Sequence, residues 1–416
     1  MIKKKAIFYD RGLYLYTAQK LGESLEKVYY YRPESNPYPE GPLGDIGKGL
    51  EEVEVVTNFW EYLDKADMIV LPDCYDGDFA HFLREKGYNV FSSLRSEVFE
   101  IDKVYFLKYL ADVGLPVAKT YRAEGLCDLV EHLKTAKGPK YLKTSYFRGD
   151  FETYKWKNLP LARPWLNDLK ARIGQREETI EILVQDPIKS AIEVGYDGFN
   201  INGVFPEGCL VGYEIKDKGI VSKVFKKTPG ILQGVNDKFS PAFAELGYQG
   251  HFTSELRITD NGEQHFIDST NRIPSPPGAL MTEIYEDYAQ DMVDIAEGKI
   301  PALKARSKYG AEIILSSAWH EKHELAVQIP KDLRRWVKLK NHKYSKEDDT
   351  FTIIPNNNGG IFGGVVGLGD TLEEATEMAV SIMEEIQATE EIEFDESVFE
   401  KAGDCVKAGE KFGIMF

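Results

Sequence analysis

Short apolar runs alternate with helix-like segments through the first hundred residues, and this alternation constrains the fold more than any other feature of the chain. The runs are KAIFY (5–9), KVYYY (27–31), VEVV (53–56), DMIVLP (67–72) and NVFSS (89–93). Helix-like segments such as YTAQKLGESLE (16–26) and DFAHFLREKG (78–87) separate several of them. Strands that alternate with helices in this way form parallel sheets with crossover helices. We therefore expect an α/β domain over residues 1–99.

The remainder of the chain is too long for one further core, because 416 residues exceed an ordinary single domain. Residues 117–190 contain the strand-like runs YLKTS and IEILV and are typical of a small α+β unit. A new strand-and-helix pattern begins near Tyr309, and its last helix starts with a capping box of Thr371 and Glu374. We predict domains at 1–99, 100–305 (with a lid subdomain at 117–190) and 306–416.

The composition narrows the range of partners. Lys and Arg number 51 against 68 Asp and Glu, which gives a net charge of −17. Such an acidic surface repels phosphate backbones and argues against nucleic acid as a direct partner. The four cysteines lack paired spacing, which fits a reducing compartment. No apolar run approaches the roughly 18–20 residues that a membrane span needs, so we expect a cytoplasmic protein without a membrane partner.

Two carboxylates lie at mirrored positions in the segment HFTSELRITDNGEQHFIDST (251–270). Asn261-Gly262 between two alternating runs predicts a hairpin with a two-residue type I′ turn. In that register Glu255 faces Asp268, with Cβ atoms roughly 5 Å apart. Like charges placed so close favour a cation between them, and Mg²⁺ held by carboxylates and substrate phosphates is suited to this. The alternative is an exposed hairpin with two solvated acids, and a three-residue loop would remove the facing pair.

The strand that carries Asp268 ends in FIDSTNRIPSPPG (266–278), which places polar groups just beyond the carboxylate. Thr270 or Asn271 offers a neutral oxygen as a third metal ligand. Arg272 can hold a phosphate through two parallel hydrogen bonds. The prolines stiffen the segment that follows, which favours a fixed position for these groups.

Two lysines precede this hairpin in the chain. Lys103 lies near the start of a predicted helix, and Lys143 lies within the strand-like YLKTS. Ser145, Arg148 and Gly149 follow in a segment that we expect to form a flap, with backbone N–H groups and hydroxyls as phosphate donors. Each lysine alone is more often a surface residue, so the interpretation depends on the whole set.

The segment IEILVQDPIKSAIEVGYDGF (180–199) is predicted to form a strand, a bend at Asp186-Pro187 and a second strand. Such a bend offers backbone donors and acceptors to the edge of a flat base, and Glu193 beyond it can bind a ribose diol. The alternative is an ordinary strand–turn–strand with Gln185 and Glu193 exposed. The chain lacks G-x-x-x-x-G-K-[ST] and G-x-G-x-x-G, so a nucleotide site here is not a P-loop or a dinucleotide-type loop.

In this order along the chain, the residues resemble those of the ATP-grasp superfamily. Within it, the chain looks most like the glycinamide ribonucleotide synthetases (phosphoribosylamine–glycine ligases), in the rhythm of residues 66–93 and 102–121 and in GGIFGGVVGLGDTLEEATEMA (359–379). The likeness spans nearly the whole chain. It implies an ATP-grasp fold, mixed α/β and α+β, with an N-terminal Rossmann-like domain and a C-terminal α+β domain.

The resemblance also implies roles for individual residues. The ATP-binding set is Lys103, Lys143, Ser145, Arg148, Gln185, Asp186, Ile188 and Glu193. The ligands of Mg²⁺ or Mn²⁺ are Glu255 and Asp268, with Thr270 or Asn271 as the third, and Arg272 and Lys143 act in catalysis. Family members convert a carboxylate to an acyl phosphate with ATP, and an amine then attacks it to give an amide, ADP and phosphate.

Departures from the family pattern point to different substrates. The family motif Glu-x-Asn-Pro-Arg reads Asp268-Ser-Thr-Asn-Arg272 here, so Thr270 and Asn271 compete as metal ligands. The N-terminal glycine-rich loop and Glu-His pair are replaced by FYDRGLYLY (8–16), and the substrate loop remains only as KKTPGILQG (226–234). We therefore expect a carboxylate–amine ligase that joins an amino acid to a small amine. Its substrate residues are predicted to be Asp10, Arg11, Lys226, Lys227 and Arg272.

Two other hypotheses remain open. One is a divergent phosphoribosylamine–glycine ligase of purine biosynthesis, which the missing N-terminal glycine loop disfavours. The other is a non-catalytic ATP-binding scaffold, which needs neither the metal cluster nor Arg272. Small-molecule substrates are expected in the first two cases, and the chain is expected to be a monomer or a homodimer.

Overall fold

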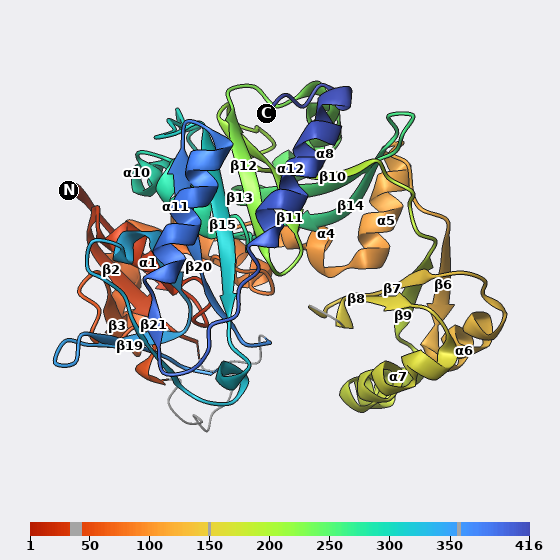
Figure 1. Ribbon diagram of the computed structural model, residues 1–416, viewed down its shortest axis with the longest axis horizontal. Helices are drawn as coiled ribbons and strands as arrows, with labels where there is room; N and C mark the ends of the chain where they lie inside the picture. The colour runs from red at the N-terminus through yellow and green to blue at the C-terminus, as the bar shows by residue number, and fades with distance from the viewer. Residues whose placement is uncertain (34–43, 149–150, 356–358) are drawn as a thin grey trace. The chain divides into compact units, whose positions relative to one another are not determined.

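The structure is a computed structural model that describes residues 1–33, 44–148, 151–355 and 359–416 (Figure 1). The chain forms two compact units. Unit 1 consists of Met1–Ser96, Val194–Thr253 and Asn271–Phe416, and unit 2 of Glu97–Glu193 and Ser254–Thr270. The division into three domains at residues 99 and 305 stays a prediction. Within the described ranges, no helix combines the length and apolar character needed to cross a membrane.

Unit 1 begins with a five-stranded parallel sheet, which confirms the prediction from the alternating pattern. Its strands are β1 (Ile2–Tyr9), β2 (Leu25–Tyr31), β3 (Glu54–Val56), β4 (Met68–Val70) and β5 (Val90–Phe91), in the order β3-β2-β1-β4-β5. Its helices are α1 (Leu15–Gly22), α2 (Phe59–Tyr62), α3 (Gly77–Glu85) and the 3-10 helices η2 (Leu63–Lys65) and η3 (Leu94–Glu97). The strand order reverses between β1 and β4, and ligands bind beyond the carboxyl ends of the strands at such a point. Asp10 and Arg11 directly follow β1 at this edge.

A larger, mainly antiparallel sheet follows in the order β14-β13-β10-β11-β12-β15-β20-β17. Its strands are β10 (Ile192–Ile201), β11 (Cys209–Ile215), β12 (Gly219–Phe225), β13 (Gln249–Ile258), β14 (Gln264–Thr270), β15 (Tyr309–Ser316), β17 (Val337–Leu339) and β20 (Ile361–Gly369). The chain passes between the two units within β10 and β13, and β14 belongs to unit 2.

The C-terminal part of unit 1 adds a small antiparallel sheet and several helices. The sheet order is β18-β19-β16-β21, from β16 (Leu325–Gln328), β18 (His342–Ser345), β19 (Thr350–Ile353) and β21 (Gln387–Ala388). The helices are α8 (Gly230–Glu245), α9 (Gly278–Ile284), α10 (Tyr288–Ala296), α11 (Leu372–Glu384), α12 (Ser397–Gly409), η6 (Trp319–Glu321), η7 (Arg334–Trp336) and η8 (Glu410–Phe412). The predicted capping box of Thr371 and Glu374 is confirmed at the start of α11.

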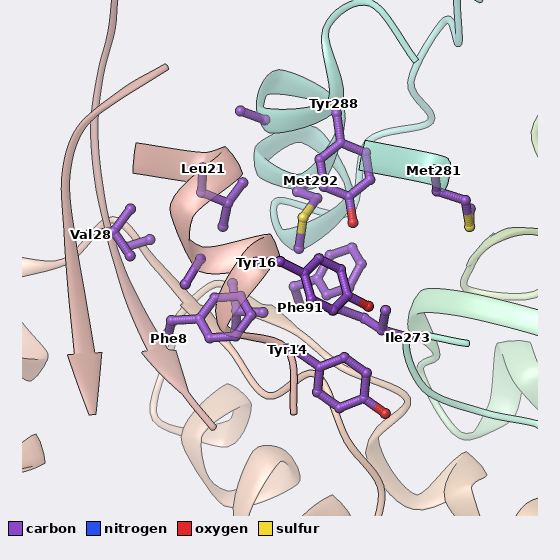
Figure 2. Close-up of a cluster of buried hydrophobic side chains, with 14 of the residues drawn as sticks. Phe8, Tyr14, Tyr16, Leu21, Val28, Phe91, Ile273, Met281, Tyr288 and Met292 are labelled. Carbon is purple, nitrogen blue, oxygen red and sulfur yellow. The ribbon is translucent and has the colours of Figure 1, made fainter. Parts of the chain in front are cut away.

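The core of unit 1 joins the N-terminal sheet to helices from later in the chain. Figure 2 shows Tyr16 of α1 and Phe91 of β5 in one cluster of buried side chains with Tyr288 and Met292 of α10. All four side chains are buried. Full burial of a side chain such as Phe91 or Met292 contributes about 1.5–3 kcal/mol. This packing fixes α1, and therefore also the loop from Asp10 to α1 that borders the edge described above.

Unit 2 is a smaller α+β unit, as the sequence predicts for this region. Its four-stranded antiparallel sheet has the order β6-β9-β7-β8, from β6 (Thr120–Glu124), β7 (Lys140–Thr144), β8 (Thr153–Trp156) and β9 (Glu181–Gln185). Its helices are α4 (Val98–Ile101), α5 (Lys103–Asp112), α6 (Gly125–Thr135), α7 (Leu159–Ile173) and η5 (Gly174–Glu178). Helices α6 and α7 cover one face of this sheet (Figure 1), with Leu133 and Trp165 in the shared core. Gly149 of the predicted flap lies outside the described residues.

Candidate nucleotide and substrate site

Lys103 is the first residue of α5, because Asp102 caps this helix. Asp102 Oδ1 accepts hydrogen bonds from two backbone N–H groups of the first turn, at 3.1 and 3.0 Å. The backbone N–H of Lys103 itself donates to Ser145 Oγ at 3.0 Å. Only 3% of the Lys103 side chain is exposed, and its Nζ forms ion pairs with Asp268 Oδ1 at 2.8 Å and with Glu152. Burial alone would lower the pKa of Lys103, but the two carboxylates raise it above its ordinary value, so the ammonium stays charged.

Lys143 lies in β7, a strand that is paired on both sides. Its Nζ donates a hydrogen bond to the backbone oxygen of Ile267 at 2.7 Å. Burial lowers the pKa of Lys143. The carboxylate of Asp268 raises this pKa and the ammonium of Lys103 lowers it further, so the net shift is downward. The structure therefore brings the two predicted lysines to the same carboxylate.

The turn between β13 and β14 differs from the prediction. The backbone N–H of Thr259 donates to Glu263 O at 3.0 Å, and that of Gly262 donates to Thr259 O at 2.8 Å. Gly262 has φ +83°, whereas a type I′ turn would also need a positive φ at Asn261, which is not among the positive-φ residues of the described chain. The predicted two-residue turn is therefore wrong, and the loop has three residues, 260–262, with glycine in the left-handed position.

This loop places Thr259 opposite Glu263, one residue away from the predicted register. Further along β14 the burial pattern changes phase, because Phe266 and Ser269 are both buried whereas strict alternation would not bury both. A phase change of this kind is typical of a β-bulge and shifts the register by one residue. Direct opposition of Glu255 and Asp268 stays a prediction. Burial lowers the pKa of Lys143, and the charges of Asp268 and Glu255 both oppose that shift.

The charges around the lysines fit a metal–phosphate ligand. Two ammonium groups, of Lys103 and Lys143, lie among three carboxylates, of Glu152, Glu255 and Asp268. Among the residues that the structure describes, no group of three or more His, Cys, Asp or Glu side chains is arranged to hold a metal ion by itself. Mg²⁺ typically uses only one or two carboxylates and takes its other ligands from phosphates and water. The donor set therefore fits a Mg²⁺ ion that arrives with a nucleotide.

A pocket adjoins these lysines within unit 2. Most of the residues that line it are apolar, among them Leu110, Leu183 and Phe266, and Lys103 and Lys143 line it as well. A mostly apolar cleft with a few polar groups is the usual form of a small-molecule site. Two residues predicted to bind adenine also line it, Gln185 and Ile188.

The remaining residues predicted to bind ATP are engaged in contacts within unit 2. The backbone N–H of Asp186 donates a hydrogen bond to the backbone oxygen of Lys119 at 2.9 Å, and the Asp186 carboxylate forms an ion pair with Lys140. Glu193 accepts a hydrogen bond from Arg257 Nε at 2.8 Å. Arg148 is partly buried beyond β7. Roles of Asp186, Glu193 and Arg148 in nucleotide binding stay predictions.

In unit 1, two arginines lie at the edge where the strand order reverses. Arg11 donates two hydrogen bonds to Asp76, from Nη1 at 2.7 Å and from Nη2 at 3.1 Å. Arg272 Nε lies 3.9 Å from Asp73 Oδ1, and Arg272 Nη1 donates to the Tyr14 hydroxyl at 3.3 Å. The aspartates both belong to the segment that follows β4. Two predicted substrate residues therefore border the same segment.

The other predicted substrate residues of unit 1 are Asp10, Lys226 and Lys227, which differ in burial. Asp10 is buried and its Oδ2 accepts hydrogen bonds from the Tyr14 N–H at 3.0 Å and the Tyr30 hydroxyl at 2.8 Å. Burial raises the pKa of Asp10 to about 6. Lys226 and Lys227 are exposed just beyond β12. Substrate contacts for all three stay predictions.

Lys340 is a candidate that sequence reasoning missed. It is 7% exposed, and its Nζ donates to Ser275 Oγ at 2.9 Å in the segment that follows Arg272. Burial lowers the pKa of Lys340 to about 8, with the carboxylate of Glu312 opposing and the charge of Arg272 adding to the shift. Lysine is rarely buried, so the stretch KLKNH gave no signal of a buried cation beside Arg272.

Comparisons with known proteins identify the fold. A phosphoribosylamine–glycine ligase from Thermotoga maritima is 15% identical, with 92% of this chain and 97% of that chain covered and a TM-score of 0.68. The biotin carboxylase domain of a Hydrogenobacter thermophilus 2-oxoglutarate carboxylase, solved with MgADP and bicarbonate, is 14% identical, with 97% and 99% covered and a TM-score of 0.67. An N5-carboxyaminoimidazole ribonucleotide synthetase from Thermotoga maritima is 16% identical, with 93% and 100% covered and a TM-score of 0.59. Neither a protein-family model nor a curated protein sequence matches the chain. These structures are of ATP-grasp proteins, and the chain has the ATP-grasp fold.

Proposed function

We propose that this chain, which has the ATP-grasp fold, is an ATP-dependent carboxylate–amine ligase. It would convert a carboxylate to an acyl phosphate with ATP and then form an amide with an amine, releasing ADP and phosphate. An amino acid and a small amine are the proposed substrates. The observation that carries this proposal is the position of Lys103 and Lys143 beside three carboxylates and a pocket lined mostly by apolar residues.

These residues suggest how a nucleotide would bind. The pocket, which Gln185 and Ile188 help to line, would hold the adenine ring. Lys103 and Lys143 would then bind the phosphates, and Arg148 and Ser145 lie in the segment beyond β7. Phosphoryl transfer needs positioning and charge neutralisation more than covalent help, and buried ammonium groups provide both.

Mg²⁺, or Mn²⁺, would be held by Glu255 and Asp268, with Thr270 or Asn271 as the third ligand. When bound, the ion would supply Lewis-acid charge to the phosphate oxygens. In this structure Asp268 is 28% exposed and already paired with Lys103.

The chemistry after nucleotide binding requires no nucleophilic side chain. The carboxylate oxygen of the substrate attacks the γ-phosphorus, the bond to the β,γ-bridging oxygen breaks, and ADP leaves. The amine nitrogen then attacks the acyl carbon, phosphate leaves, and the nitrogen loses a proton. Arg272 would stabilise the negative charge on phosphate or acyl oxygens, since a guanidinium binds two oxygens at once.

We propose that the reversal point of the parallel sheet in unit 1 binds the acceptor substrate. Arg11, Arg272 and Lys340 supply positive charge there, and Asp73 and Asp76 supply negative charge. A ligand with both an ammonium and a carboxylate group matches such a mixed set. We propose a cytoplasmic monomer or homodimer that acts on small molecules of this kind.

A second candidate is a divergent phosphoribosylamine–glycine ligase, which the TM-score of 0.68 to such an enzyme supports. The sequence FYDRGLYLY (8–16) in place of a glycine-rich loop disfavours it. Growth of a purine auxotroph that lacks this ligase and carries the present chain would favour the second candidate. Absence of growth despite good expression would favour different substrates.

The proposal is tested by ADP release. Purified protein with MgATP is offered mixtures of amino acids and small amines, and ADP is measured with a coupled assay. We expect ADP release only when both a carboxylate and an amine are present, and none from the Lys143→Met variant. Tight ATP binding without turnover across a broad panel would contradict the ligase proposal and support a scaffold.

A further inference from the structure

Glu152 lies at the phosphate-binding lysine although no sequence pattern pointed to it. Its carboxylate forms an ion pair with Lys103 Nζ, on the same ammonium group that Asp268 contacts at 2.8 Å. Lys103 is 3% exposed and Glu152 is 21% exposed, so this ion pair is largely shielded from water. The Glu152 carboxylate thus occupies one of the positions from which an anion can contact the Lys103 ammonium.

The backbone around Glu152 is held in place. Glu152 directly precedes β8, and its backbone oxygen accepts a hydrogen bond from the Thr144 N–H at 2.9 Å. One residue later, Thr153 pairs with Lys143 across the hairpin. Because the backbone is fixed and the side chain is partly exposed, rotation of the Glu152 side chain alone can carry its carboxylate toward water.

A phosphate at Lys103 and the carboxylate of Glu152 would compete for the same ammonium group. Lys103 Nζ has three hydrogens, and Glu152 and Asp268 already accept from this group. A phosphate would be a third anion at this ammonium, and burial strengthens its repulsion by the Glu152 carboxylate. A phosphate therefore binds Lys103 more strongly when the Glu152 carboxylate has turned away toward water.

We propose that Glu152 is a specificity-determining residue of the nucleotide site. This inference rests on the ATP site of the proposed function. Its carboxylate takes the place of a phosphate at Lys103 until a nucleotide with enough phosphate charge displaces it. Ligands that lack phosphate, such as adenosine, reach the apolar pocket without moving Glu152 and gain nothing from Lys103. The Glu152 carboxylate therefore competes with every phosphate ligand for Lys103 and weakens its binding.

The test compares the binding of ADP and adenosine by titration calorimetry. The variants are Glu152→Gln, which keeps the shape but removes the charge, and Glu131→Gln as the matched control. Glu131 lies in α6 of the same unit, is exposed and pairs with Lys134. ADP is titrated first with EDTA and then with Mg²⁺, and thermal unfolding of each variant confirms that it is folded.

We expect Glu152→Gln to bind ADP about tenfold more tightly without Mg²⁺. This factor lies between the small energy of an exposed ion pair and the large energy of a buried one, because the pair of Glu152 with Lys103 is partly exposed. Adenosine affinity should stay within about twofold, as should every affinity of Glu131→Gln. In a Lys103→Met background the gain from Glu152→Gln should disappear, because the competition needs the ammonium. This last result separates competition at Lys103 from a general change in the pocket.

Equal or weaker binding of ADP by Glu152→Gln would overturn the role proposed for Glu152, while ADP binding by the wild type would leave the proposed function standing. Weaker binding only with Mg²⁺ would make Glu152 a metal ligand and overturn the role as well. Equal gains for ADP and adenosine would contradict competition for Lys103. If neither the wild type nor the variant binds ADP, the proposed function and the role of Glu152 fail together.

Discussion

Replacing Lys103 and Lys143 one at a time with methionine should change the stability of unit 2 by very different amounts. Methionine keeps most of the length of lysine and removes only the ammonium group. Lys103 pairs with two carboxylates, whereas Lys143 Nζ donates a hydrogen bond to the backbone oxygen of Ile267. The two variants therefore leave different groups behind.

The Lys103→Met variant leaves the carboxylates of Asp268 and Glu152 close together without their shared cation. Breaking a fully buried ion pair costs about 3–5 kcal/mol. Asp268 and Glu152 are 28% and 21% exposed, so water recovers part of this. We expect the free energy of unfolding to fall by about 2–3 kcal/mol.

The Lys143→Met variant removes a charge from a position where burial lowers its pKa. The loss of one hydrogen bond and the relief of burying a charge oppose each other, so the net change should stay within about 1 kcal/mol. Both variants should nevertheless bind MgADP more weakly, by about 10- to 150-fold, because each loses a charge-assisted contact to phosphate.

Urea unfolding followed by hydrogen exchange of peptides from residues 97–193 reports the stability of unit 2 alone. Calorimetric titration with MgADP reports binding. A Lys143→Met variant that loses as much stability as Lys103→Met would refute the pairing of both carboxylates with Lys103. Unchanged MgADP binding in both variants would refute the position of the phosphates.

Three further outcomes are expected. Asp268→Asn should abolish ADP release in the ligase assay while circular dichroism shows an intact fold, and an active variant would remove Asp268 from the metal site. Asp197 is buried and its pKa is raised to about 7 by burial, with Thr253 opposing. The folded chain therefore holds a proton that the unfolded chain releases between about pH 4 and 7, so stability falls by about 1.4 kcal/mol per pH unit as the pH rises across that window. Urea unfolding at pH 5 and pH 8 should show a larger loss in the wild type than in Asp197→Asn, because other buried carboxyl groups such as Asp10 still contribute to the variant's loss, and equal losses in both would contradict it. Thr371→Ala should lower the unfolding free energy by about 1 kcal/mol through loss of the capping box with Glu374, and a change below about 0.3 kcal/mol would show that the cap is redundant.

Local patterns predicted much of the fold. The alternation of runs predicted a parallel sheet, which the structure contains, but the strand order β3-β2-β1-β4-β5 was not predicted. Lys103 at a helix start and Lys143 within a strand were also predicted correctly as positions in the fold. Both inferences rest on residues close together in the chain.

The failures have local and non-local causes. Asn261-Gly262 suits both a type I′ turn and a three-residue loop with glycine in the left-handed position, so the pair alone does not fix the register. Glu152 and Lys340 depend on residues far away in the chain. Glu152 shares the Lys103 ammonium with Asp268, and Lys340 is buried where the charge of Arg272 also lowers its pKa. No window of sequence shows such contacts.

Isotope transfer tests most directly whether the chain joins a carboxylate to an amine through an acyl phosphate. Amino acids labelled with ¹⁸O in the carboxylate are incubated with MgATP, the small amines and the protein, and the released phosphate is analysed by mass spectrometry. We predict one ¹⁸O atom in each phosphate released together with ADP, because the carboxylate oxygen stays on phosphorus when the amine attacks. ADP released with unlabelled phosphate would contradict an acyl-phosphate intermediate.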